Sequence, residues 1–148
     1  MTAIIWIHLA ATLWMTGLIW FVQTVHYPLF ALVGPEDFGE YHRVHVRALG
    51  RLVGPVMILE AFCATWLLVV SIGTAVLIWA AIGWGLLVII WLSTFCLQVP
   101  AHRVLSRNTG NPHPTIQSLT AGNWIRTIGW SARSALAMAW CAWEGAPV

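Results

Sequence analysis

Four apolar segments, each long enough to cross a bilayer, constrain this chain more than any other feature of its sequence. The hydrocarbon core of a bilayer is about 30 Å thick, and an α-helix needs about 20 apolar residues to span it. The segments cover residues 3–25, 52–72, 74–99 and 125–143. In lipid a helix satisfies its backbone hydrogen bonds internally. The sequence therefore predicts an all-α integral membrane protein.

The composition excludes an ordinary water-soluble domain. Hydrophobic residues make up 59% of the chain and charged residues only 8%, whereas soluble domains carry about 25% charged residues. The mean hydropathy is +0.79. A chain with so few charges lacks the polar surface that water requires, so the lipid bilayer is its expected partner.

The 148 residues predict one domain, residues 1–148, with helices at about 3–26, 36–72, 74–106 and 115–144. Because the connection "SIGT" is short, we expect the second and third helices to be antiparallel neighbours. Glu36 and Asp37 suit the first turn of the second helix, which extends beyond the membrane on the cytoplasmic side. The expected fold is a four-helix bundle with up-down-up-down topology.

The basic residues predict the orientation of the chain. All seven are arginines, and threading four helices places every one of them towards the same side. By the positive-inside rule that side is cytoplasmic, so both termini face the periplasm of a bacterial inner membrane. This explanation of the basic charge leaves no reason to expect a nucleic-acid partner. The arginines are Arg43, Arg47, Arg51, Arg103, Arg107, Arg126 and Arg133.

Four histidines are predicted to meet at the cytoplasmic end of the bundle. His26 ends the first span, His42 and His45 are three residues apart in "YHRVH", and His102 lies in "QVPAH". Helix bundles bind metals through inward-facing histidines at helical spacing. Neutral imidazole suits iron, copper and zinc, so these four residues are the candidate metal ligands.

Polar side chains on the same helices are candidates for contacting the cofactor or substrate. Gln98 lies one turn from His102, and Asn123, Arg126 and Trp130 follow one another at three- and four-residue steps, hence on one helical face. Pro100 removes a backbone donor, kinks its helix and frees a carbonyl group. The candidates are Gln23, Gln98, Asn123, Trp130 and Tyr41, with Tyr27 as a further polar neighbour.

Glu60 and Arg126 are the predicted catalytic residues, handling protons or substrate charge. An ionisable residue inside a membrane costs about 2.5–3.5 kcal/mol, which favours a function. Glu60 follows His45 by fifteen residues, about 22 Å along a helix, so the two cannot share one metal. Glu60 instead relays a proton, holds a second site, or pairs with Arg133 or His8. A purely structural ion pair is the alternative.

Several motifs resemble a family of small bacterial four-span membrane proteins of unknown function. They are "HYPLF", "FxxYHxxH", "GPxMxxE", "QxPxH" and "NWxRTxxW", and together they cover nearly the whole chain. In size and topology the chain is also similar to the anthrone-oxygenase-like group of four-span proteins. This second resemblance implies oxidative chemistry on an aromatic or lipophilic substrate, and it carries no residue roles over.

These observations predict a membrane metalloprotein, an oxidoreductase or oxygenase that acts on a lipophilic small molecule. One alternative is a b-type haem or quinone protein that transfers electrons, with two of the histidines as axial haem ligands. Another is a non-enzymatic accessory subunit, packed through its tryptophans in a homo-oligomer or larger membrane complex. The sequence leaves the choice among iron, copper and zinc open.

Overall fold

The computed structural model describes residues 2–107 and 111–144, and every regular element in that part of the chain is helical. This confirms the predicted all-α class. The elements are α1 (Thr2–Phe21), η1 (Val22–His26), α2 (Tyr27–Leu29), η2 (Phe30–Leu32), α3 (Pro35–Val70), α4 (Leu77–Ser93), η3 (Thr94–Gln98), α5 (Val99–Arg107) and α6 (His113–Glu144). The segments η1 and η3 are π-helices, and η2 is a 3₁₀-helix.

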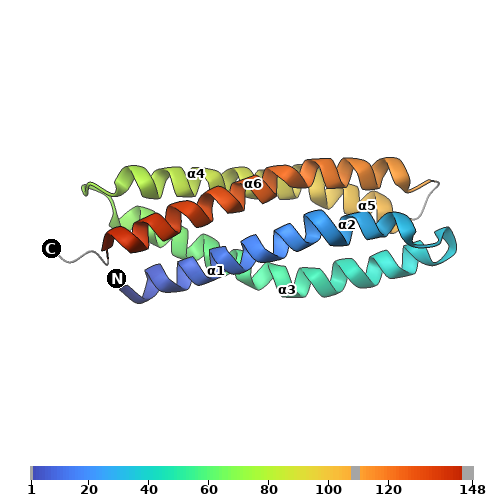
Figure 1. Cartoon of the computed structure of the whole chain (residues 1–148), viewed down its shortest axis with the longest axis horizontal. Helices are drawn as coiled ribbons and strands as arrows, with labels where there is room; N and C mark the ends of the chain where they lie inside the picture. The colour runs from blue at the N-terminus through green and yellow to red at the C-terminus, as the bar shows by residue number, and fades with distance from the viewer. Residues whose placement is uncertain (1, 108–110, 145–148) are drawn as a thin grey trace.

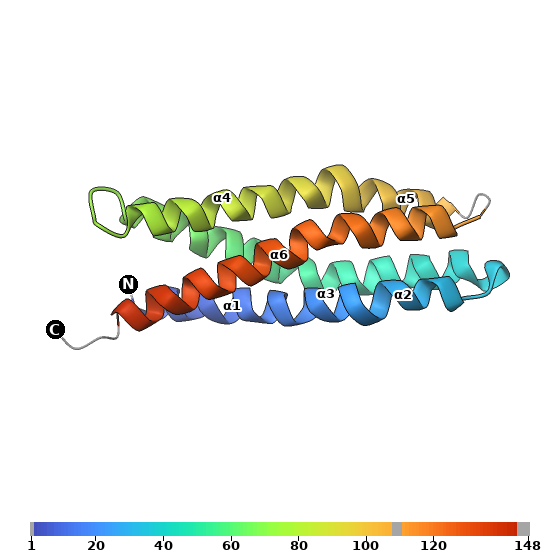
Figure 2. The same ribbon diagram turned by 45° about the horizontal axis from the view of Figure 1, so that its top comes forward.

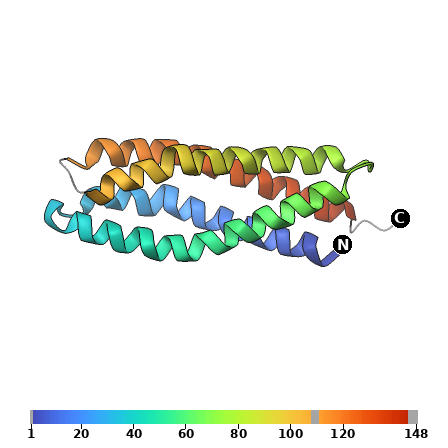
Figure 3. The same ribbon diagram turned by 180° about the vertical axis from the view of Figure 1, so that it is seen from behind.

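These elements form four long rods that lie side by side (Figures 1 and 2). The first rod is α1 continued by η1, α2 and η2, the second is α3, the third is α4 continued by η3 and α5, and the fourth is α6. The start of α1, the end of α6 and the turn between α3 and α4 lie at one end (Figure 3). At this turn Gly73 has a φ of 81°, which a residue without a Cβ adopts readily. We call this the Gly73 end, and the opposite end the His-cluster end.

Three of the rods are long and apolar enough to cross a membrane. They are the helical stretches Ala3–Leu32, Pro35–Val70 and Leu77–Arg107. The fourth rod, α6, is 32 residues long but is not among these candidates in the described part of the chain. It carries Arg126 and Arg133 in its interior, which lower its hydropathy.

The two π-helices stand in the same relation to a proline. Residue i of an α-helix donates to the carbonyl of residue i−4, and proline has no N–H to donate. Here η1 ends two residues before Pro28 and η3 ends two residues before Pro100. The residue between each π-helix and its proline donates its N–H to the carbonyl five residues earlier: Tyr27 to Val22, and Val99 to Thr94. The distortion expected at Pro100 is therefore the π-helix η3. A π-helix widens the helix locally and often marks a functional site.

The apolar core lies between the rods and includes Met15, Phe30, Ile90 and Trp130, each at most 1% exposed. Helices α4 and α6 approach closely at Gly129, where a Cβ would lie 2.8 Å from Cγ1 of Ile90. The larger apolar side chains outside the core, such as Trp6 and Phe62, are exposed. A surface of this kind fits a lipid environment.

The arginines divide into two groups. Five are exposed on α3 and α5, namely Arg43, Arg47, Arg51, Arg103 and Arg107. Arg126 and Arg133 are buried inside the bundle, at 8% and 2% exposure. The exposed group alone can contact lipid headgroups, so the orientation argument depends on five arginines rather than seven.

Candidate functional site

The structure brings the four predicted histidines together, from three different rods. His26 comes from η1, His42 and His45 from α3, and His102 from α5. The ring centroids are 4.4 Å apart for His26 and His45, 5.2 Å for His42 and His102, 5.9 Å for His45 and His102, and 6.0 Å for His42 and His45. We call these four residues the His cluster.

The rings of the His cluster bond to one another in two pairs. Nε2 of His42 lies 3.0 Å from Nδ1 of His102, and Nε2 of His26 lies 2.8 Å from Nδ1 of His45. In each pair one nitrogen donates a proton and the other accepts it, so each pair contains at least one acceptor nitrogen.

Further groups hold the remaining nitrogens of His42 and His102. Nδ1 of His42 lies 3.0 Å from the hydroxyl of Ser106, and Nε2 of His102 lies 3.1 Å from the hydroxyl of Tyr27. Tyr27 also donates to the amide oxygen of Gln98 at 3.4 Å. Nε2 of His45 is different: it is buried and has no hydrogen-bond partner among the described residues. One imidazole nitrogen is thus available in the middle of a polar cluster.

Two buried phenylalanines cover the His cluster on one side. Phe38, which is 0% exposed, stacks on His42 at 5.6 Å with an interplanar angle of 17°. Phe30 contacts His26, His42 and His45 at 5.1, 5.5 and 5.0 Å between ring centroids. These rings fix the imidazole planes and reduce access of water.

The predicted amide residues form a second layer towards α6. Nδ2 of Asn123 donates to Oε1 of Gln23 at 2.8 Å, and Nε2 of Gln23 donates to the carbonyl of Thr120. Nη1 of Arg126 donates to Oδ1 of Asn123 at 3.2 Å. The guanidinium also lies 5.3 Å from the Trp130 ring centroid, a cation–π contact.

Arg126 is a buried cation without a carboxylate partner in the described part of the chain. Within that part Arg126 forms no ion pair, and its Nε has no hydrogen-bond acceptor. Arg126 interacts with the Tyr27 side chain, which in turn contacts His102. A buried charge of this kind favours an anion close by, since arginine does not lose its proton in proteins.

Glu60 lies in a separate polar cluster nearer the Gly73 end. Its Oε1 accepts from Nε of Arg133 at 3.0 Å and from Thr12 at 2.9 Å, and its Oε2 accepts from the indole N–H of Trp130 at 2.9 Å. Arg133 also donates to the carbonyl of Gly83 and, at 3.0 Å, to Nε2 of His8. We call Glu60, Arg133 and His8 the Glu60 cluster.

The structure does not bring Glu60 to the His cluster. It lies fifteen residues beyond His45 in α3, about 22 Å at a rise of 1.5 Å per residue. Both its oxygens are occupied, and its pairing with Arg133 is one of the options that the sequence left open. Glu60 therefore has no direct route to a reaction at the His cluster.

Other sequence-based candidates differ in their positions. Tyr41 is 38% exposed and contacts Phe30 edge-on, outside the polar cluster. Sequence reasoning missed Ser106, although it follows His102 by four residues and so shares its helical face. It also missed Phe30 and Phe38, because the residue type alone does not mark which phenylalanines will cover a site.

Two further observations concern ligands. In the residues that the structure describes, no set of three or more histidine, cysteine, aspartate or glutamate side chains is already arranged to hold one metal ion. A groove of about 210 Å³ lies between α3 and the rod formed by α1 and η1, and two of the histidines are among the residues that line it. Its lining residues are Leu18, Phe21, Val22, His26, His45, Ala48, Leu49 and Leu52.

Comparison with known proteins adds no assignment. No protein-family model, curated protein or solved structure matches this chain. The geometry of the site must carry the functional argument alone.

Proposed function

We propose that this protein is a membrane metalloprotein in which His42, His45 and His102 bind a transition metal. The observation that carries the proposal is the arrangement of the outer nitrogens of these three rings. Each has a neighbouring acceptor: Ser106 for His42, Tyr27 for His102 and His26 for His45.

This arrangement matches what metal-binding histidines need. A ligating imidazole donates its other ring N–H to an acceptor, which fixes the tautomer and the ring orientation. With a metal bound, those donations would leave lone pairs on Nε2 of His42, Nδ1 of His102 and Nε2 of His45, and the proton that the first two nitrogens share in its absence would be released. The first two already face each other at 3.0 Å, and the third is the buried nitrogen without a partner in the described residues.

The distances are close to those of a metal site. Two nitrogens bound to one tetrahedral metal at about 2.0–2.1 Å lie about 3.3 Å apart. The pair formed by His42 and His102 needs to open by only a few tenths of an ångström. His45 must turn its Nε2 towards that pair, and His26 then acts as its outer partner rather than as a fourth ligand.

The ligand set favours zinc, copper or iron. Three neutral imidazoles without thiolate or carboxylate suit these metals, and three protein ligands leave a coordination position open for substrate. The b-type haem alternative fits less well. In a b-type haem protein the wide flat ring of the haem would have to fit between the two imidazoles that hold its iron. The paired rings of the His cluster touch directly.

A lipophilic substrate is supported by the groove between α1 and α3. It is apolar along its length, opens on the side of the bundle, and reaches His26 and His45. A molecule dissolved in the bilayer reaches the site by this path without entering water. Arg126 supplies a positive charge close to Tyr27 and suits a substrate oxygen that becomes anionic. An oxidoreductase or oxygenase reaction would use all three features: the metal, the apolar groove and the positive charge of Arg126.

The proposed topology follows the five exposed arginines. They lie on the portions of α3 and α5 near the His-cluster end, which the positive-inside rule makes cytoplasmic. With α6 as a fourth span, shielded by burial of its arginines, both termini face the periplasm of an inner membrane. The exposed tryptophans Trp6, Trp66 and Trp79 lie towards the opposite, periplasmic interface.

Metal analysis of the purified protein tests the proposal. In detergent, after addition of copper, zinc or iron(II) and removal of free ions, we expect about one ion per chain. The variants His42→Ala, His45→Ala and His102→Ala should lose it. His26→Ala should keep it with affinity lowered about 10- to 100-fold, and His113→Ala, on the exposed start of α6, is the matched control. Equal metal content in all five variants would reject the proposal.

The accessory-subunit alternative makes a different forecast for the same variants. If the histidines only hold helices together, the variants should change thermal stability or assembly, and the unmodified protein should bind no more metal than His42→Ala. Measuring the melting temperature beside the metal content separates the two roles.

A further inference from the structure

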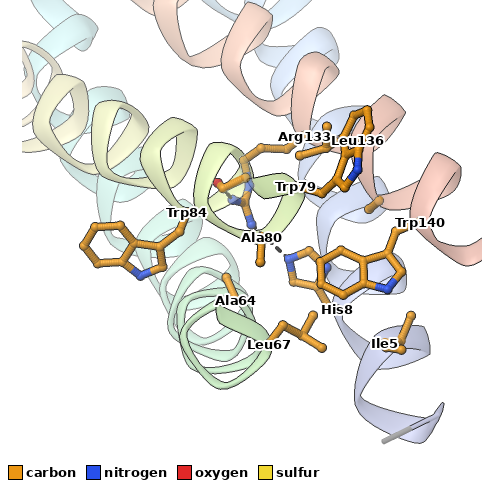
Figure 4. A pocket seen from close by; sticks show the side chains of 12 residues that line it. Ile5, His8, Ala64, Leu67, Trp79, Ala80, Trp84, Arg133, Leu136 and Trp140 are labelled. Carbon is orange, nitrogen blue, oxygen red and sulfur yellow. Dashed lines mark hydrogen bonds between the residues drawn. The ribbon is translucent and has the colours of Figure 1, made fainter. Parts of the chain in front are cut away.

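A second cavity lies towards the Gly73 end of the bundle, away from the His cluster. Figure 4 shows the side chains that line it. Its volume is about 30 Å³, enough to hold a small polar group or a water molecule. Side chains from α1, α3, α4 and α6 form its wall. His8 and Arg133 supply its polar edge, and Trp79 and Trp140 supply aromatic rings.

A larger apolar groove adjoins this cavity. It measures about 310 Å³ and shares three lining residues with the cavity: Trp79, Leu136 and Trp140. The two spaces are neighbours: a small cavity with His8 and Arg133 as its polar residues lies beside an aromatic and aliphatic groove. Binding sites for small molecules have this form, an apolar cleft of about 300–1,000 Å³ with a few fixed polar groups.

The polar groups at this cavity are donors. Arginine can only donate, so the contact between Nη2 of Arg133 and Nε2 of His8 makes that nitrogen an acceptor and places the ring proton on Nδ1. The indole N–H of Trp140 is buried and has no acceptor among the described residues. An unmatched buried donor is costly, so a ligand that accepts a hydrogen bond is favoured here.

The charge around the cavity is already balanced. Arg133 uses Nε on Glu60, Nη1 on the Gly83 carbonyl and Nη2 on His8, so each of its three nitrogens already has a partner. Glu60 compensates its charge directly. The site therefore suits an uncharged molecule.

From these observations we infer that this cavity and its groove bind a quinone-type molecule: flat, apolar, uncharged and carrying carbonyl oxygens. A carbonyl accepts from Trp140 and His8, the ring packs on the tryptophans, and the tail follows the groove towards lipid. A phospholipid ester offers an acceptor too, but its branched glycerol does not use two aromatic walls. The inference is independent of the proposed metal site, because the two sites share no residue.

The test is a titration of the detergent-purified full chain with decylubiquinone, followed by quenching of tryptophan fluorescence. We expect saturable binding. Trp140→Phe keeps an aromatic ring but removes the donor, and should weaken binding about three- to tenfold, the effect of one hydrogen bond. Trp124→Phe is the matched control: Trp124 is on the same helix, exposed, and far from the cavity, so its affinity should be unchanged.

Two further measurements keep the test decisive. Decylbenzene, which has the tail and a ring but no carbonyl, should compete with decylubiquinone at least about tenfold more weakly than decylubiquinone binds, because it accepts neither hydrogen bond. Quenching that does not saturate, or equal affinities for Trp140→Phe and Trp124→Phe, would overturn the inference. So would displacement of decylubiquinone by an equimolar amount of phosphatidylethanolamine, which would assign the cavity to a lipid. A melting temperature for each variant ensures that binding is compared between folded proteins.

Discussion

Nε2 of His42 lies 3.0 Å from Nδ1 of His102, although the two residues are 60 positions apart in the chain. The contact joins α3 to α5 at the His-cluster end. The other ring nitrogen of each histidine is hydrogen-bonded as well, that of His42 to Ser106 and that of His102 to Tyr27. These two imidazoles are two of the three ligands that we propose for the metal, and Tyr27 holds one of them from outside.

Removing the Tyr27 hydroxyl should weaken metal binding without removing a ligand. In Tyr27→Phe the outer nitrogen of His102 loses its acceptor, and changes of this kind lower metal affinity about 10- to 100-fold. Tyr41→Phe removes the chain's other tyrosine hydroxyl from an exposed ring and should leave the affinity unchanged. Competition with a chelator of known affinity measures both. Equal affinities for the two variants would mean that Tyr27 does not support a ligand.

The buried ion pair between Glu60 and Arg133 should contribute strongly to stability. In Glu60→Gln the cation of Arg133 stays buried without a counter-charge, which costs about 3–5 kcal/mol. Glu40→Gln breaks the exposed pair with Arg43 and should cost at most about 1 kcal/mol. Unfolding in detergent by increasing amounts of SDS compares the two. Similar midpoints would show that the bundle does not depend on the buried pair.

Trp130 and Trp91 should respond oppositely to replacement by phenylalanine. Trp130→Phe removes a hydrogen bond to a charged carboxylate, worth about 1.5–3 kcal/mol. The indole N–H of Trp91 is buried and has no acceptor in the described part of the chain, so Trp91→Phe should be neutral or stabilising. The same unfolding assay is suitable. A greater loss for Trp91→Phe would reveal a partner of Trp91 that the structure does not contain.

The close approach of α4 and α6 should make Gly129 intolerant of any side chain. A Cβ there would lie 2.8 Å from Ile90, and overpacking costs about 1–3 kcal/mol. Gly85→Ala is the matched control, because a Cβ at Gly85 meets nothing within 4 Å and alanine favours a helix by up to about 1 kcal/mol. Melting temperatures should move in opposite directions. A rise for Gly129→Ala would show that Ile90 moves aside easily.

The sequence was sufficient for the helices and for the meeting of the histidines. Helix positions follow from apolar runs, and the expected start of the second helix near Glu36 agrees with the observed start at Pro35. His42 and His45 are one turn apart, so they reach the same side of α3 in any packing. The metal-ligand roles remain predictions.

The sequence could not predict which side chains pair, because pairing depends on how each helix is rotated about its axis. Glu60 had several candidate partners, and only the packed bundle selects Arg133 with Thr12 and Trp130 beside it. The π-helices were also beyond the sequence. Pro100 indicated a distortion, but the residue spacing does not say whether the helix responds with a kink or with the five-residue hydrogen bond from Val99 to Thr94 that the structure has.

Trp130 touches both polar regions of the bundle, since its N–H bonds Glu60 and its ring lies under Arg126. Residues that share a packed partner are not energetically independent, so a change at Trp130 alters the surroundings of Glu60 and of Arg126 together. The two polar regions of the bundle therefore meet in one side chain and are not separated by apolar packing.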